Sequence, residues 1–379
     1  MGKTGIEEHF IERDGKRLRY GFTTGTCAAA AAKAAAILLL SGTAPKTVAI
    51  RTPKGIDLKL PVLEPVRTDG FASCAIRKDS GDDPDVTDGV LVYAKTMFSR
   101  EPGVSIDGGV GVGRVTKPGL KQAVGEAAIN PVPREMIRLA VGEIAEEFGC
   151  AGGISVVISI PEGVALAEKT FNPRLGIVGG ISILGTSGIV EPMSEDALVD
   201  SIALEIRQRK ALGDTRLVLT PGNYGADFLK AAYGVTDERI VKCSNYIGDA
   251  LGHAVRTGFS EVLLVGHIGK FVKLSGGIFN THSKYGDHRA ELMASAARAA
   301  GADEETAQSM YDCVTTDEML RILREKDLLS GTMDVLSTRI DAALAARFPA
   351  LRTGVIVFTT GNCELFRNAS AARWTEEGI

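Results

Sequence analysis

The segment from residue 266 to residue 291 concentrates side chains that could do chemistry. It includes three of the five histidines together with lysine, amide and hydroxyl side chains, among them His267, His282, His288, Lys270, Lys273, Asn280 and Thr281. Such polarity directly after a buried strand costs free energy unless the groups face a ligand or water. The histidine spacings are irregular and no HExxH occurs, so we expect no metal site. Recognition of an anionic or polar ligand is the favoured interpretation, and a solvated loop is the alternative.

Four short turns that contain glycine follow predicted strands in the second half of the chain. They also carry hydroxyl, amide or imidazole groups: Gly185-Thr186, Gly222-Asn223, Gly266-His267 and Thr360-Gly361-Asn362. In open α/β sheets, ligands bind outside the carboxyl ends of strands, where glycine lets backbone N–H groups come close. One such turn is expected of any short connection, but four favour a nucleotide-like ligand. Neither GxGxxG nor GxxxxGK[ST] occurs, so no standard dinucleotide site and no Walker-type ATP hydrolysis is expected.

Two candidate groups lie in the first half. Thr24 and Thr26 precede an alanine-rich run and could offer hydroxyls and free N–H groups to an anion, although plain N-capping explains them as well. Arg114 and Lys117 follow a glycine-dense stretch and could bind a carboxylate, or could belong to a flexible hairpin. The acidic cluster at residues 82–85 lacks EF-hand spacing and is interpreted as an exposed turn.

The elements that must position these residues follow two different patterns. Up to residue 160, the sequence predicts helices over residues 26–41 and 131–148 and strands near residues 46–52, 58–66, 90–93 and 154–160, without strict alternation. Beyond residue 173, strands at residues 177–184, 215–220, 239–243, 261–265 and 355–359 alternate with helices at residues 194–212, 226–233, 246–257 and 289–300. Such alternation is typical of a parallel sheet with helices on both faces. We therefore expect an N-terminal α+β domain over residues 1–172 and a Rossmann-like α/β domain with a mostly parallel sheet over residues 173–379.

Composition excludes several classes of protein. The 379 residues carry 43 Lys and Arg against 47 Asp and Glu, a net charge of −4, which disfavours nucleic-acid binding. The six cysteines lie far apart without zinc-like spacing, so we expect free thiols. The charged leader is no signal peptide, and the apolar stretch at residues 28–40 is interrupted by Lys33 and too short to cross a bilayer. These features predict a cytoplasmic protein without a membrane partner, and a homo-oligomer is compatible with them.

Several long blocks resemble one family, the cobalt-precorrin-5B C-1-methyltransferases of the CbiD type. The matching blocks, spread over almost the whole chain, are GFTTGTCAAAAAKAA from residue 21, SGDDPDVTDG from 80, GVGRVTKPGL from 111, INPVPREMI from 129, FNPRLGIVGGISILGTSGIVEPMS from 171, TPGNYG from 220 and GHIGKFVKLSGGIFNTHSKYGDHRAE from 266. The resemblance implies transfer of a methyl group from S-adenosylmethionine to C-1 of a cobalt corrinoid, giving cobalt-precorrin-6A in anaerobic cobalamin biosynthesis. A non-catalytic corrinoid- or nucleotide-binding carrier is the alternative.

The implied ligands assign a role to each candidate residue. The methyl donor would contact the glycine turns: Gly185, Thr186, Gly222, Asn223, Gly266, Thr360, Gly361 and Asn362. The corrinoid, with its many carboxylates, would meet hydroxyls, amides and cations: Thr24, Thr26, Arg114, Lys117, Lys270, Lys273, Asn280 and Thr281. His267 or His282 would accept a proton after methylation. The corrinoid carbon is itself the nucleophile, so Cys27 is expected only to pack, and no protein-bound metal is expected.

Overall fold

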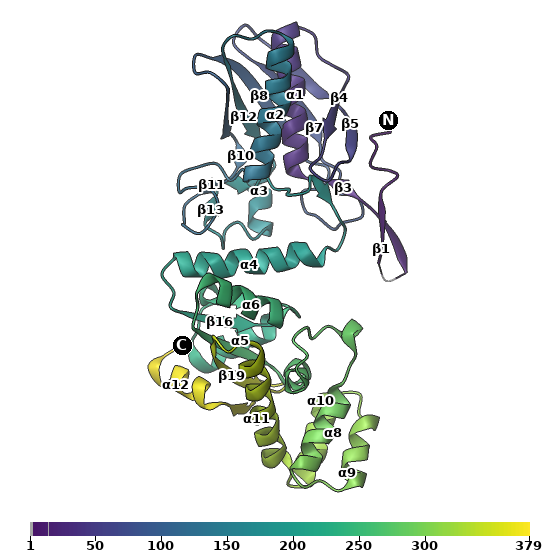
Figure 1. Ribbon diagram of the computed structural model, residues 1–379, viewed down its shortest axis with the longest axis vertical. Helices are drawn as coiled ribbons and strands as arrows, with labels where there is room; N and C mark the ends of the chain where they lie inside the picture. Colours follow the sequence, from purple (N-terminus) through teal and green to yellow (C-terminus); the bar gives the residue numbers. More distant parts are fainter. Residues whose placement is uncertain (1–2, 14) are drawn as a thin grey trace. The chain divides into compact units, whose positions relative to one another are not determined.

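A computed structural model describes residues 3–13 and 15–379 of the chain (Figure 1). The chain forms two compact units, residues 1–194 and residues 195–379. It is a mixed α/β protein, as the sequence predicts. The division falls 22 residues later than predicted, at 194 instead of 172.

The first unit combines short strands with two long helices. Its elements are β1 Phe10–Arg13, β2 Lys16–Arg19, β3 Gly21–Phe22, α1 Thr24–Ser41, β4 Thr47–Arg51, β5 Asp57–Pro61, β6 Leu63–Arg67, β7 Ala72–Arg77, β8 Leu91–Ser99, β9 Val104–Gly108, β10 Gly111–Val112, β11 Arg114–Val115, α2 Pro131–Glu147, β12 Gly153–Ser159, α3 Gly163–Leu166, β13 Ile177–Val178, β14 Gly180–Ile181 and β15 Ile189–Val190. The main sheet has the order β6-β7-β8-β12-β9, in which only the β12–β9 pair is parallel.

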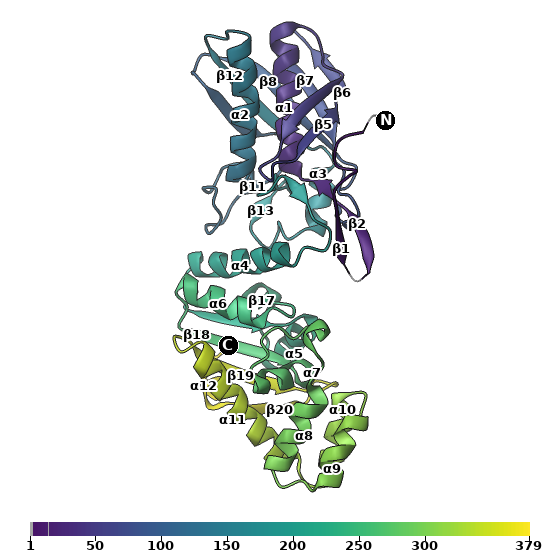
Figure 2. The ribbon, with the colours of Figure 1, turned by 45° about the vertical axis from the view of Figure 1, so that its right-hand side comes forward.

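Helix α1 is the centre of the first core. Thr23 caps it, accepting a hydrogen bond from the Thr26 N–H, and Gly42 ends it in the left-handed region at φ 79°. The alanines of its middle are buried, and their small side chains let α1 pack closely on α2, β7 and β8 (Figure 2). At 18 residues α1 is apolar and long enough to cross a membrane, so length does not exclude a span as the sequence argument assumed; however, 78% of it is buried inside this unit.

Residues 173–194 belong to the first unit because their strands pair with it. β13 pairs with β11, β14 with β10, and β15 with β3. The sequence predicts one strand at residues 177–184 at the start of the second domain. This is wrong, because the segment forms two short strands, β13 and β14, and both belong to the first unit. Local apolar patterning indicated a strand, but its pairing partners lie more than 60 residues upstream.

The second unit has a five-stranded sheet between two layers of helices. Its elements are α4 Glu195–Ala211, β16 Arg216–Thr220, α5 Asn223–Tyr233, β17 Ile240–Lys242, α6 Ile247–Thr257, β18 Glu261–His267, α7 Ile268–Phe271, α8 Arg289–Ala299, α9 Glu304–Ser309, α10 Thr316–Glu325, α11 Leu329–Arg347, β19 Arg352–Phe358, β20 Glu364–Arg367 and α12 Ala369–Glu377. The strand order is β17-β16-β18-β19-β20, parallel except for β20, which the sequence did not predict.

Alternate residues of these strands pack on opposite faces of the sheet. Leu217 and Leu264 lie in the core formed with α4, α6, α8, α10 and α11. Val218 and Val265 lie in the core formed with α5 and α12. Both faces of the parallel strands are therefore covered, which accounts for their nearly continuous apolar sequences.

Candidate functional site at the carboxyl edge of the parallel sheet

The four parallel strands of the second unit end at one edge of the sheet. α5 leaves β16 on one face, where its Phe228 packs with Val218, whereas α6 leaves β17 on the other face, where its Ile247 packs with Leu219. The chain therefore changes faces between β16 and β18, which are neighbours in the sheet. The crevice outside such a switch point is where open α/β sheets bind ligands. The turns after β16 and β18 are consequently the first places to look for a site.

The turn after β16 leaves the start of α5 open. Gly222 is the N-cap of α5, and no side chain among the described residues caps this helix. Gly225 lets α5 approach the sheet, because a Cβ there would lie 2.8 Å from the Cβ of Thr220. Asn223 is exposed and 79% of Tyr224 is accessible. The first N–H groups of α5 can therefore meet an anion or a polar ligand.

Gly222 and Asn223 thus lie at the switch point. Asn223 is held there, since its Oδ1 accepts a hydrogen bond of 2.9 Å from Lys242 Nζ at the end of β17. Tyr224 was not predicted from the sequence, although an aromatic residue between Asn223 and Gly225 in a predicted ligand turn was the available signal.

The residues that end β18 serve mainly the fold. Gly266 makes room for a ring, because a Cβ there would lie 2.1 Å from Phe271. His267 Nδ1 accepts a hydrogen bond from the Gly269 N–H (3.0 Å), and Nε2 lies 3.1 Å from Thr360 Oγ1. Because Nδ1 accepts, the neutral ring carries its proton on Nε2 and donates it to Thr360. Burial lowers the pKa of His267, which favours this neutral ring.

His267 therefore lacks a free nitrogen for the proton-accepting role that the sequence suggested. Its contact continues through Thr360, whose Oγ1 donates to Asp317 Oδ2 over 2.6 Å. This chain of hydrogen bonds ties the turn after β19 to α10. Gly361 and Asn362, with φ of 90° and 59°, remain exposed in the same turn and accessible to a ligand.

The two lysines after β18 are in opposite situations. Lys273 is 4% exposed, and its Nζ donates to the carbonyls of Thr281 (3.2 Å) and Gly286 (2.9 Å). Its ammonium holds the loop in place, so the predicted contact with a substrate carboxylate is not available. Lys270 is half-buried in α7, and its ammonium has no hydrogen-bond or ion-pair partner in the described part of the chain.

The loop that Lys273 holds contains three more candidates. Asn280 Oδ1 accepts from the His282 N–H (3.1 Å), and the buried Thr281 hydroxyl lies 3.1 Å from Asn245 Oδ1. These two side chains shape the loop. His282 is exposed, and its Nδ1 accepts from the Lys284 N–H (3.1 Å). Its Nε2 has no partner among the described residues, so His282 is the histidine of this pair with a free nitrogen.

Gly185 and Thr186 belong to the first unit, and the turn that contains them follows no strand of this sheet. Gly185 has a φ of +135°, and a Cβ there would lie 2.2 Å from Thr23 Oγ1. The glycine therefore allows close packing on the cap of α1. Thr186 is exposed beside it. The prediction that this turn belongs to the same sheet edge as Gly222 is wrong, since it followed from the misassigned strand at residues 177–184.

Thr24 and Thr26 are also occupied by the fold. The Leu184 N–H donates to Thr24 Oγ1 over 2.9 Å, and Thr26 Oγ1 donates to the Gly188 carbonyl over 2.6 Å. Thr26 has no accessible surface and Thr24 has 5%. Direct contact of these hydroxyls with a substrate, as predicted, is not possible in this structure.

Arg114 and Lys117 differ in the same way as the two lysines of the second unit. Arg114 forms a two-bond ion pair with Asp107 (2.7 and 2.9 Å) and donates to the Gly108 carbonyl, and this ion pair lowers the pKa of Asp107. Lys117 is exposed, its stem lies over Gly176, and its ammonium has no partner among the described residues. Of the two predicted cations, Lys117 is the one available to a ligand.

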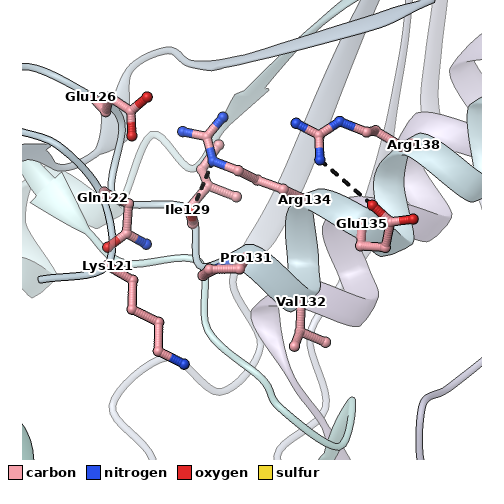
Figure 3. Close-up of a pocket in the computed structure, with 9 residues that line it drawn as sticks. All are labelled: Lys121, Gln122, Glu126, Ile129, Pro131, Val132, Arg134, Glu135 and Arg138. Carbon is pink, nitrogen blue, oxygen red and sulfur yellow. Dashed lines mark hydrogen bonds and ion pairs between the residues drawn. The ribbon is translucent and has the colours of Figure 1, made fainter.

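A cavity of about 500 Å³ opens at the start of α2 (Figure 3). It is lined by Lys121, Gln122, Glu126, Ile129, Pro131, Val132, Arg134, Glu135 and Arg138. Arg134 is held by the carbonyls of Ile129, Ile106 and Ala127. Lys121 has no partner in the described chain, and Arg138 has only an exposed pair with Glu135 at 3.6 Å. None of these cations was predicted from the sequence.

Other reactive groups are sparse in the described residues. No three His, Cys, Asp or Glu side chains come together there as a metal-binding set. All six cysteines are free thiols, as predicted. Cys27 and Cys243 are buried, and burial raises the pKa of each thiol to about 12. Neither is therefore a nucleophile at neutral pH.

Comparison with known proteins identifies relatives along nearly the whole chain. The CbiD family matches residues 11–192, and the CbiD C-terminal domain matches residues 280–369. A cobalt-precorrin-5B C(1)-methyltransferase of Ruminiclostridium cellulolyticum is 48% identical over 94% of this chain and 93% of its own. One of Alkaliphilus metalliredigens is 48% identical over 97% of each chain. A solved structure of a cobalamin biosynthesis protein (cbiD) from Archaeoglobus fulgidus, 28% identical, covers 75% of this chain and 89% of its own with a TM-score of 0.40. The chain belongs to the CbiD family, as its motifs indicated.

Proposed function

We propose that this chain transfers a methyl group from S-adenosylmethionine to C-1 of cobalt-precorrin-5B, giving cobalt-precorrin-6A and S-adenosylhomocysteine in cobalamin biosynthesis. The observation that carries the proposal is the 48% identity, over nearly the full length of both chains, to proteins named for this activity. A biosynthetic step of this kind fits a cytoplasmic enzyme. The cobalt belongs to the substrate, and we expect no metal held by the protein.

We place the methyl donor at the switch point of the second unit, in a Rossmann-like arrangement. Support comes from the uncapped start of α5 at Gly222 and Asn223, and from the exposed Gly361 and Asn362 after β19. Tyr224 adds an accessible aromatic face of the kind on which a base such as adenine stacks. The standard dinucleotide order of strands is 3-2-1-4-5-6, whereas this sheet has the order 2-1-3-4-5, whose ligands also bind at the switch point.

The chemistry asks little of the protein beyond alignment. The electron pair of C-1 attacks the methyl carbon, and the C–S pair returns to sulfur, leaving a neutral thioether. No protein nucleophile is required, which agrees with the buried state of Cys27 and Cys243. Holding both reactants in line supplies much of the rate. The methylated corrinoid then loses a proton. We retain His282 as the acceptor of this proton, since its Nε2 has no partner among the described residues.

We propose that carboxylates of the corrinoid bind cations of the first unit. Lys117, Lys121 and Arg138 are exposed, and the last two line the cavity at the start of α2. α2 has no acidic residue in its first turn and no side-chain cap among the described residues, so its N-terminus adds to the positive potential. These groups replace Thr24, Thr26 and Arg114 of the sequence argument.

The test is an anaerobic incubation of the full chain with cobalt-precorrin-5B and S-adenosylmethionine, followed by mass spectrometry. We expect the corrinoid to gain about 14 Da, one CH₂ unit, only when the donor is present. A carrier would bind the corrinoid without a change in its mass. A donor with a deuterated methyl group controls for the origin of the added carbon, because the gain then rises to about 17 Da.

A further inference from the structure

We infer that Lys270 binds the methionine carboxylate of the methyl donor, and not a carboxylate of the corrinoid. The inference rests on the proposed function, in which the donor occupies the switch point between β16 and β18. Lys270 lies in α7, three residues after β18 ends at His267. It therefore follows one of the two strands that border the crevice.

The ammonium of Lys270 lacks the partners that the neighbouring lysines have. Lys242, at the end of β17, donates to Asn223 Oδ1 (2.9 Å) and pairs with Asp237 (3.4 Å). Lys273 donates to two carbonyls. Lys270 has no such contact in the described part of the chain, although it is half-buried. A cation partly removed from water without compensation costs free energy, so an anionic ligand at this point is stabilising.

The charged groups that act on Lys270 do not offset this cost. Burial lowers the pKa of the Lys270 ammonium, and the positive charge of Lys273 lowers it further. A negative charge on the Cys243 thiol would oppose this, but burial raises the pKa of the thiol to about 12, so it is neutral at physiological pH. A bound anion would supply the counter-charge that the described residues do not.

The charges of the methyl donor match an unpaired lysine at this point. S-adenosylmethionine carries a single anionic group, its α-carboxylate, next to an ammonium, a sulfonium and a neutral adenosine. Across the crevice from α7, the adjacent strand β16 leads to the uncapped start of α5, an 11-residue helix. Tyr224 and Asn223 on that side offer an aromatic face and an amide. On the α5 side the charge of Lys242 is already paired with Asp237, which leaves Lys270 for the anionic end of the donor and Asn223 and Tyr224 for its neutral end.

The experiment measures binding of two ligands to the full-length chain by calorimetry. S-Adenosylhomocysteine has the amino-acid carboxylate, whereas 5′-methylthioadenosine keeps the thioether and adenosine but lacks it. We expect Lys270→Met to weaken binding of S-adenosylhomocysteine by roughly 10- to 100-fold, the range for a hydrogen bond to a charged group. Binding of 5′-methylthioadenosine should change less than about twofold. Lys230→Met is the matched control, since it removes an exposed lysine at the other end of α5 and should leave both affinities unchanged.

The outcomes separate this inference from the proposed function. If the unaltered chain binds neither ligand, the donor placement itself is contradicted, and the inference with it. If the unaltered chain binds both ligands, but Lys270→Met weakens both affinities equally or leaves both unchanged, the assignment of Lys270 to the carboxylate is overturned. A Lys270→Met variant with normal affinity for S-adenosylhomocysteine and a raised KM for cobalt-precorrin-5B would assign the lysine to the corrinoid instead. Circular dichroism of each variant verifies that it is folded.

Discussion

Two helix starts in this molecule look alike in sequence and differ in what their polar groups do. At the start of α1, Thr23 caps the helix, and the hydroxyls of Thr24 and Thr26 bind the backbone of residues 184–188. At the start of α5, no described side chain caps the helix, and Asn223 and Tyr224 are exposed. At the start of α1 the polar groups already have partners within the protein, whereas the first N–H groups of α5 have no side-chain cap among the described residues. A polar, glycine-containing turn is thus a binding candidate only when its groups lack partners in the protein.

The largest effect that distinguishes these two regions is expected from Gly185→Ala. Gly185 has a φ of +135°, and the new Cβ would collide with the Thr23 side chain that caps α1. We expect a loss of about 2–4 kcal/mol in the free energy of unfolding of the first unit, from backbone strain and the displaced cap. Denaturant unfolding measures this loss.

The same variant tests the role that the sequence gave to Gly185. Because Gly185 packs on the Thr23 cap of α1, its substitution should leave the affinity for S-adenosylhomocysteine unchanged. Gly361→Ala is the companion variant in the second unit. It introduces backbone strain, because the φ of Gly361 is +90°, but no collision, because nothing lies within 4 Å of a Cβ there. If Gly185→Ala were as stable as the original chain and lost the donor, the distinction between the two helix starts would be wrong.

Thr26→Val probes the occupied helix start more gently. Valine has nearly the shape of threonine, but it cannot donate to the Gly188 carbonyl, which would keep only the Thr23 N–H as its partner. We expect the free energy of unfolding to fall by about 0.5–1.5 kcal/mol, the net contribution of one hydrogen bond. Thermal unfolding and donor binding should be measured on the same preparation. A change in binding without a change in stability would return Thr26 to the ligand site.

The sequence predicted much of the fold because its signals are local. Residues close together in sequence specify the caps of α1, the prolines at the start of α2 and the apolar strands β16 to β19. The same local signals placed Gly222 and Asn223 at a strand end. Local pattern could not show that residues 177–181 pair with β10 and β11, since that depends on partners far along the chain.

The candidate site was harder to predict because it depends on which polar groups remain free. The partners of Thr24 and Thr26 lie about 160 residues away, at Leu184 and Gly188. Lys270 and Lys273 are three residues apart and of one type, yet only Lys273 meets backbone carbonyls. Spacing cannot distinguish such residues, whereas a count of hydrogen-bond partners can.

A pH profile should separate the hydrogen-bonded His267 from a freely titrating group. Burial lowers the pKa of His267 below 6.5, so the unfolded chain binds this proton more readily than the folded chain does. The stability that the neutral ring contributes is therefore present above pH about 6.5 and is lost as the pH falls through the lower pKa of the folded state. We expect His267→Asn, whose amide oxygen can still cap α7, to make the unfolding free energy of the second unit less dependent on pH below about 6.5.

His253 is the necessary comparison, because burial and two nearby arginines also lower its pKa. His253→Gln should remove only the contribution of His253 to the pH dependence of the unfolding free energy. The contribution of His267 should remain in this variant. Denaturant unfolding at a series of pH values measures both. An unchanged profile in His267→Asn would mean that His267 titrates alike in the folded and unfolded chain, and the inferred neutral ring would be wrong.

The smallest effects are expected from Arg114 and Lys117, which repeat the comparison within the first unit. Arg114→Ala removes an exposed ion pair with Asp107 and should cost less than about 1 kcal/mol of stability. Its guanidinium is already engaged, so the KM for cobalt-precorrin-5B should stay the same. Lys117→Ala removes a free cation and should raise that KM about two- to fivefold without changing stability, the scale of one exposed charge pair.

The KM for cobalt-precorrin-5B should be measured for both variants by steady-state kinetics at a low and a high salt concentration. An exposed cation that attracts a carboxylate loses its effect as salt screens the charge. The KM difference between Lys117→Ala and the original chain should therefore shrink at high salt, while Arg114→Ala should match the original chain at both concentrations. If Arg114→Ala instead showed the larger, salt-dependent rise in KM, the ion pair with Asp107 would have to open for the substrate. Hydrogen-bond occupancy in the ligand-free chain would then be a poor guide to binding in the first unit.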